Sequence, residues 1–81
     1  MHVTVRLFAR LRDITGSGEL ARDVAPGATV GALWRDLTQE YPELGPYERS
    51  VSSAVNLDYA RMDRELRDGD EIAFLPPVSG G

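Results

Sequence analysis

Apolar and polar residues alternate along the first segment of the chain, His2–Phe8. Val3, Val5 and Leu7 fall on one side of an extended chain, and the residues between them are polar. This period of two predicts a strand with one buried face. Phe8 is the exception, because it places an aromatic ring on the side that is otherwise polar.

A second strand is predicted over Glu19–Val24, with Leu20 and Val24 facing inward. Between the two strands, Ala9–Ile14 predicts a short helical turn that ends at Gly16. A connection of this length allows the two strands to pair antiparallel. We therefore expect them to form one side of a sheet.

The strongest helical pattern follows Thr29, a residue type that caps helix N-termini well. Apolar residues then recur at i, i+3, i+4, i+7 and i+11, namely Val30, Leu33, Trp34, Leu37 and Tyr41. This spacing predicts a helix with one apolar stripe, which packs on the sheet as core. Pro42 is predicted to end the helix, and Glu43–Ser50 to form a loop or a short helical turn.

Three further strands are predicted, over Ser53–Val55, Tyr59–Ala60 and Glu71–Leu75. In the last one, Ile72 and Phe74 face inward and alternate with outward residues. The first and last strands are the most hydrophobic, so we place them side by side in the middle of the sheet.

This order of elements indicates the α+β class and, more specifically, a ubiquitin-like β-grasp. We expect a mixed sheet of four to five strands with one main helix packed across it. The 81 residues point to a single domain. We assign residues 1–75 to the β-grasp domain and residues 76–81 to a projecting Gly-Gly tail.

The composition excludes several kinds of chemistry. The chain has no cysteine, and its single histidine, His2, indicates neither a metal site nor a catalytic base. A net charge of −4 argues against a nucleic-acid partner. No apolar run approaches the roughly 20 residues that span a membrane. The absence of cysteine fits a reducing compartment, and we expect a cytoplasmic protein. All nine basic residues are arginines, so no side chain offers an amine for an isopeptide bond.

The most distinctive feature is the tail, Pro76-Pro77-Val78-Ser79-Gly80-Gly81. The two prolines favour a stiff, extended exit, and six residues reach roughly 20 Å. Glycine fits where a Cβ would clash, as in a narrow enzyme tunnel that excludes water from a reactive acyl group. The pattern therefore predicts that the carboxylate of Gly81 carries the chemistry. The competing interpretation is a frayed end that tolerates small residues.

Outward apolar side chains predict a docking patch beside the tail. Phe8 and Leu75 lie on the outer face of the two central strands, and Tyr59 extends that face. Arg12, on the turn after the first strand, is either solvated or pairs with acidic groups of a partner. The segment 68–70, Asp-Gly-Asp, lacks the spacing of a calcium loop and predicts a solvated turn.

These residues resemble a known family, the MoaD/ThiS-type sulfur carriers. Residues 68–81, DGDEIAFLPPVSGG, look like the end of the small subunit of molybdopterin synthase, the MoaD type. Leu7-Phe8-Ala9 followed by Arg12, and Ala54-Val55-Asn56 before a short hairpin, agree with it. The resemblance covers the whole chain, and its most specific part is the C-terminal motif.

The resemblance implies a non-catalytic sulfur-donor subunit that binds no cofactor and no metal. A ubiquitin-activating-enzyme-like adenylyltransferase uses ATP to adenylate Gly81, and a persulfide sulfur donor converts it to a thiocarboxylate. The tail then enters the large subunit of molybdopterin synthase and donates sulfur to precursor Z, forming the molybdopterin dithiolene. The family usually assembles as a heterotetramer with two carriers on a dimer of large subunits.

The resemblance also implies which residues contact partners. These positions are Phe8, Arg12, Tyr59, Leu75, Pro76, Pro77, Val78 and Ser79, with Gly80 and Gly81 at the reacting end. Leu75 departs from the family pattern, because relatives often have an aromatic residue there. We expect this difference to alter packing at the interface and not the carrier chemistry.

Three other functions stay open at this point. A carrier for thiamine or tRNA thiolation uses the same chemistry, but such relatives usually lack the proline pair, so Pro76-Pro77 favours molybdopterin synthase. A ubiquitin-like modifier would join its glycine to lysines of target proteins, and a chain without lysine could act in it only as a donor. A β-grasp binding module without covalent chemistry would not need the last two glycines.

Overall fold

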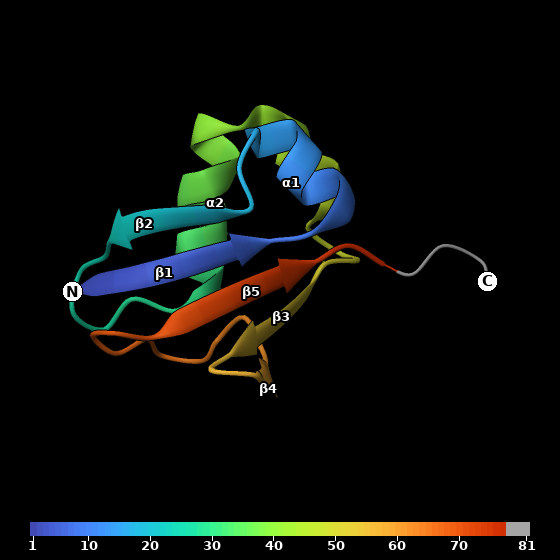
Figure 1. The fold of residues 1–81 in the computed structure, drawn as a ribbon. Coiled ribbons are helices and arrows are strands. Elements are labelled where there is room, and N and C mark those ends of the chain that lie inside the picture. Colours follow the sequence, from blue (N-terminus) through green and yellow to red (C-terminus); the bar gives the residue numbers. More distant parts are fainter. Residues whose placement is uncertain (78–81) are drawn as a thin grey trace.

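The computed structural model describes residues 1–77 (Figure 1). Five strands and three helical segments follow one another in the order β1 (His2–Leu7), α1 (Ala9–Thr15), β2 (Glu19–Asp23), α2 (Val30–Glu40), the 3-10 helix η1 (Pro42–Tyr47), β3 (Ser52–Val55), β4 (Asp58–Ala60) and β5 (Glu71–Leu75). None of the helices in this part of the chain is long and apolar enough to cross a membrane.

The strands form one mixed sheet in the order β2-β1-β5-β3-β4. The two central strands, β1 and β5, run parallel, with Val5 opposite Ile72 and Leu7 opposite Phe74. The other neighbouring pairs are antiparallel. The predicted β-grasp, with the first and last strands side by side, is confirmed.

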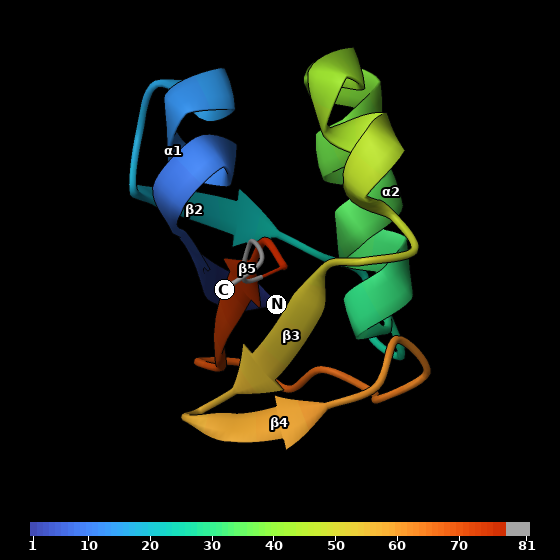
Figure 2. The ribbon, with the colours of Figure 1, turned by 90° about the vertical axis from the view of Figure 1, so that its right-hand side faces the viewer.

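The core lies between one face of the sheet and α2 (Figure 2). The inward residues of the central strands are almost fully buried, and α2 contributes the predicted stripe of Val30, Leu33, Trp34 and Leu37. The rings of Trp34 and Phe74 meet at a centroid distance of 4.9 Å and an angle of 54°. Such tilted aromatic pairs stabilise beyond the area they bury, so this contact ties the helix to the central strand.

Some element boundaries differ from the sequence prediction. β1 ends at Leu7 instead of Phe8, because the Phe8 carbonyl already accepts the first hydrogen bonds of α1, from the amides of Leu11 and Arg12. β2 ends at Asp23, one residue before Val24, although Val24 is buried as predicted. Pro42 follows the end of α2 and also begins η1, since the first turn of a helix needs no amide hydrogen there.

The N-terminus of α2 is capped from two directions. The Thr29 hydroxyl accepts a hydrogen bond from the amide of Ala32, at 3.1 Å. The amide of Gly31 donates to the carbonyl of Met62 at 2.7 Å, in the connection between β4 and β5. A Cβ on Gly31 would lie only 3.1 Å from that carbonyl oxygen, so this helical glycine permits the close approach of the loop.

Replacing Thr29 by alanine tests the cap. Thr29→Ala should lower the free energy of unfolding by about 1 kcal/mol, because the Ala32 amide loses its side-chain acceptor. Thr29→Ser keeps the hydroxyl and should stay close to the unaltered chain. Urea denaturation measures both, and equal stabilities of the two variants would contradict the assigned cap.

Candidate functional site

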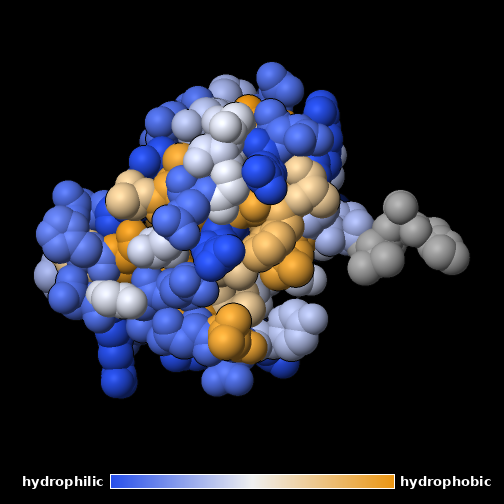
Figure 3. All heavy atoms as spheres, in the orientation of Figure 1, coloured by the Kyte–Doolittle hydropathy of each residue, from blue (hydrophilic) through white to orange (hydrophobic). Residues whose placement is uncertain are grey.

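The face of the sheet opposite α2 carries an apolar groove of about 250 Å³. Its lining residues come from β5, from β3 and β4 with the turn between them, and from the position directly after β1: Phe8, Ala54, Leu57, Tyr59, Glu71, Ala73 and Leu75. In the space-filling view, apolar side chains gather over the C-terminal ends of the central strands, beside the point where the chain leaves the domain (Figure 3).

Strand alternation explains the shape of the groove. Because Ile72 and Phe74 point into the core, Ala73 and Leu75 point outward. Ala73 lies directly opposite Ala54 on β3, so two methyl groups face each other across the strands. Small side chains at this pair keep the floor low, and the larger residues around it form the walls.

The walls account for all the large hydrophobic residues that are exposed within residues 1–77. Phe8 is 40% exposed, Tyr59 is 84% exposed and Leu57 is 89% exposed. Single exposed apolar residues are common, but three around one groove are typical of an interaction site. The sequence predicts Phe8, Tyr59 and Leu75 on this face, and the structure brings them together.

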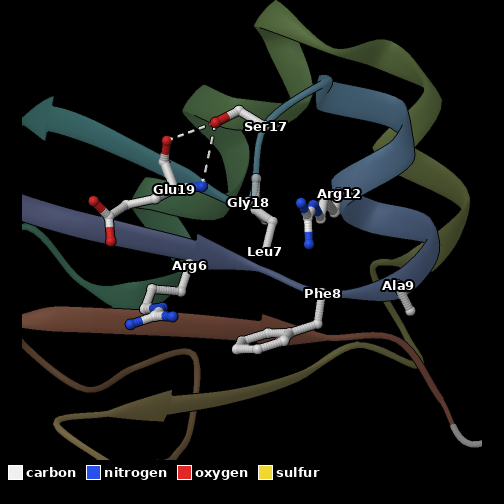
Figure 4. Close-up of a pocket in the computed structure, with 8 residues that line it drawn as sticks. All are labelled: Arg6, Leu7, Phe8, Ala9, Arg12, Ser17, Gly18 and Glu19. Carbon is white, nitrogen blue, oxygen red and sulfur yellow. Dashed lines mark hydrogen bonds between the residues drawn. The ribbon is translucent and has the colours of Figure 1, made fainter.

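Phe8 reaches this position because the chain turns directly after β1. It is the N-cap of α1 with extended backbone, and the next residue, Ala9, has a φ of +51°. On its other side Phe8 borders a second, polar hollow, drawn in Figure 4 with Arg6, Arg12, Ser17 and Glu19 among its lining residues.

Charged groups therefore flank the apolar groove. Arg12 lies over Gly18, where a Cβ would come within 3.3 Å of the Arg12 Nε atom. Arg6 approaches Glu71 at 3.8 Å, and both side chains are partly exposed. The predicted docking residue Arg12 thus lines the polar hollow and not the apolar groove, with Phe8 shared between the two.

A two-residue turn between β3 and β4 supplies Leu57, a groove residue that no pattern in the sequence indicates. Asn56 and Leu57 both have positive φ, +50° and +76°. This combination is that of the type I′ hairpin turn, for which Asn followed by Gly is the familiar signal. The sequence carries only half of that signal, since leucine replaces the glycine.

Asp70 corrects the prediction of a solvated turn over residues 68–70. It is only 8% exposed, and its carboxylate accepts hydrogen bonds from Asn56 Nδ2 at 2.9 Å and from the Arg67 amide at 2.8 Å. Asp68 in the same turn is exposed and accepts a bond from the His2 amide. Asp70 therefore joins the hairpin turn to the start of β5, and the predicted solvent exposure holds only for Asp68 and Gly69.

The remaining predicted residues lie along the chain after the groove. Pro76 is half-buried and Pro77 exposed, directly after Leu75. Val78, Ser79, Gly80 and Gly81 lie outside the described residues, and so does most of the segment 76–81 assigned to the tail. Within residues 1–77, no three histidine or acidic side chains are grouped to hold a metal ion.

Comparisons with known proteins agree on one family. The model of the ThiS family matches residues 5–81. The molybdopterin synthase sulfur carrier subunit of Chlamydomonas reinhardtii is 35% identical over the full length of both chains. The crystal structure of SAMP1, a small archaeal modifier protein of Haloferax volcanii, is similar with a TM-score of 0.85 at 31% identity, over all of both chains.

A third similarity concerns an assembly. A chain in the complex of subunits 1 and 2 of molybdopterin-converting factor from Helicobacter pylori matches with a TM-score of 0.70 at 29% identity, again over the whole of both chains. The shared fold therefore occurs both in single small proteins and in a two-subunit complex.

Removing the Asp70 carboxylate tests whether it holds the hairpin turn. Asp70→Ala should lower the free energy of unfolding by about 2–3 kcal/mol. The side-chain amide of Asn56 and the backbone amide of Arg67 both lose the buried carboxylate that accepts their hydrogen bonds. Asp68→Ala is the matched control on the same turn and should cost less than about 1 kcal/mol, since its bond is exposed. Chemical denaturation compares them, and equal losses would reject the distinct role of Asp70.

Proposed function

This chain belongs to the ThiS family, and on that premise we propose that it is the sulfur-carrier small subunit of a molybdopterin synthase. The full-length similarity to the Chlamydomonas reinhardtii sulfur carrier subunit supports this assignment. The Helicobacter pylori complex supports a large synthase subunit as the partner. The proline pair at the start of the tail favours this pathway over thiamine or tRNA thiolation.

The observation that carries the proposal is the position of Leu75. It ends β5, lines the apolar groove and is followed by the six residues that finish in Gly-Gly. Six residues span at most roughly 20 Å, so an enzyme that acts on Gly81 has to lie against this end of the domain. A groove at this end of the domain gives the enzyme a surface to bind while the carboxylate of Gly81 lies in its active site.

The chemistry takes place at the C-terminal carboxylate. The carboxylate of Gly81 attacks the α-phosphorus of ATP on the activating enzyme, and pyrophosphate leaves. A persulfide of the sulfur donor then attacks the acyl carbon and displaces AMP, and cleavage of its S–S bond by a thiol leaves a thiocarboxylate on Gly81. In the synthase this sulfur is transferred to precursor Z, and water releases the carboxylate again. Gly80 lets the chain thread the active site, where a Cβ would clash.

The domain itself provides the docking surface for the partner enzymes in each of these steps. Phe8, Tyr59 and Leu75 give the activating enzyme and the large subunit an apolar surface, and Arg12 pairs with an acidic group beside it. The chain holds no cofactor of its own in this scheme, since ATP is bound by the activating enzyme. The carriers and large subunits assemble as a heterotetramer in the cytoplasm.

A second candidate function is protein modification, which the similarity to SAMP1 favours. The same activated Gly81 would then acylate a lysine of a target protein. This chain has no lysine, so it can donate its carboxylate but cannot carry a side-chain isopeptide bond to another copy. Both functions require activation of Gly81 and differ in the nucleophile that follows.

Deleting Gly81 tests the carrier chemistry. The chain should gain a thiocarboxylate when it is expressed with its activating enzyme and a sulfur source, read as about +16 Da and separated from oxidation by thiol-selective alkylation and mapping of the C-terminal peptide. The deletion should abolish this product without changing the melting temperature, because Phe74 is the last buried residue within the described residues 1–77. If the full-length chain is expressed under these conditions and gains no thiocarboxylate, the proposed function is rejected.

Phe8→Ala tests the docking surface. The affinity for the large subunit should fall by roughly 10–100-fold, as expected for an aromatic side chain at the centre of an interface. Arg35→Ala on α2, an exposed position of the helix that covers the opposite face, serves as the control and should leave the affinity unchanged. Isothermal titration calorimetry measures both, and equal affinities would remove Phe8 from the interface.

A further inference from the structure

Leu57 occupies a position that is unfavourable for leucine in two respects. Its φ of +76° lies in the left-handed region, where a bulky side chain is a genuine outlier and glycine is the usual residue of a two-residue hairpin turn. Its side chain is also 89% exposed, so it buries almost nothing in the folded domain. The isolated domain gives no reason for leucine at this position.

The turn that carries Leu57 is held firmly in place. Asn56 exchanges two backbone-directed bonds with Glu71, since the Asn56 amide donates to the Glu71 carbonyl at 2.8 Å and Asn56 Oδ1 accepts from the Glu71 amide at 3.0 Å. The Asn56 side-chain amide also donates to the buried carboxylate of Asp70. Strained backbone persists where its surroundings over-determine it, and such places cluster at ligand clamps.

The strained turn places Leu57 at the wall of the apolar groove. Leu57 lines the apolar groove together with Tyr59 and Leu75, and these walls stand around the low floor of Ala54 and Ala73. The chain that continues from Leu75 to Gly81 limits any partner that takes Gly81 to this end of the sheet. The occupant of the groove is therefore the protein that receives the tail.

We infer that Leu57 is a specificity-determining residue for docking of the large subunit of molybdopterin synthase, which the strained hairpin turn holds at the outer wall of the groove. This inference rests on the proposed function. It requires an apolar ridge on the large subunit that fits between Leu57 and Leu75. The isolated carrier keeps the strain and the exposed side chain, and both become useful only when the partner covers the groove.

Leu57→Gly separates the effect of Leu57 on the stability of the domain from its effect on docking. The melting temperature should rise, and the affinity for the large subunit should fall. Glycine adopts positive φ without a steric penalty, so the melting temperature should rise by about 2–5 °C. Loss of the apolar side chain should weaken binding to the large subunit by about tenfold or more. Thermal unfolding and calorimetric titration of the full chain measure the two effects.

Two more variants control for flexibility of the turn. Leu57→Asn also accepts the left-handed backbone, and it should bind as weakly as the glycine variant because it lacks the apolar contact. Leu57→Met keeps an apolar side chain of similar volume and should retain the affinity within about threefold.

The outcomes distinguish this inference from the proposed function. If the glycine and asparagine variants bind the large subunit as tightly as the unaltered chain does, Leu57 has no docking role and the carrier function stands. If Leu57→Gly lowers the melting temperature, leucine serves the isolated domain and the inference also fails. If the unaltered chain does not bind the large subunit, both proposals are overturned.

Discussion

The parallel pairing of β1 with β5 determines the rest of the molecule. Leu7 lies opposite Phe74, and both side chains enter the core beneath α2. Because side chains alternate along a strand, the next residue of each strand, Phe8 and Leu75, has to emerge on the opposite face at the same end of the sheet. The register of β1 and β5 therefore places Leu7 and Phe74 in the core. It also places Phe8 and Leu75 at the groove, next to the point where the chain continues after β5.

Much of this arrangement follows from the sequence, because periodicity reports burial directly. The alternation in the first and last strands and the stripe of α2 each specify one buried face, and together they predict the sheet, its central pair and the outward Phe8, Tyr59 and Leu75. The proposal of carrier chemistry rests on a terminal sequence motif and not on the fold. Both kinds of signal are local, and a single chain is enough to interpret them.

Leu57 and Asp70 could not be predicted because their roles depend on distant parts of the chain. Asp70 looks like an ordinary turn residue until the hairpin at Asn56, 14 positions earlier, supplies its donor. The sequence predicts a short hairpin after Asn56, but leucine stands where turn chemistry calls for glycine, so the sequence does not indicate the left-handed backbone of Leu57. Phe8 was placed on the correct face, but its position between an apolar groove and a polar hollow depends on the turn into α1.

The two faces of the sheet divide the work of the domain. α2 and the buried residues of β1 and β5 supply stability on one face, and the other face is shaped by residues that contribute little to the core. Changes on the outer face are therefore expected to leave the packing of the core intact. The hairpin network around Asn56 and Asp70 is the exception, since it serves both the fold and the groove.

The facing alanines at positions 54 and 73 have a consequence for evolution. They point away from the core, so a larger residue at either position would fill the floor while the packing beneath α2 stays intact. One substitution would then change the shape of the outer face while the core stays as it is. A duplicated copy of such a domain could therefore keep its fold and present a different outer surface after a single change at either alanine.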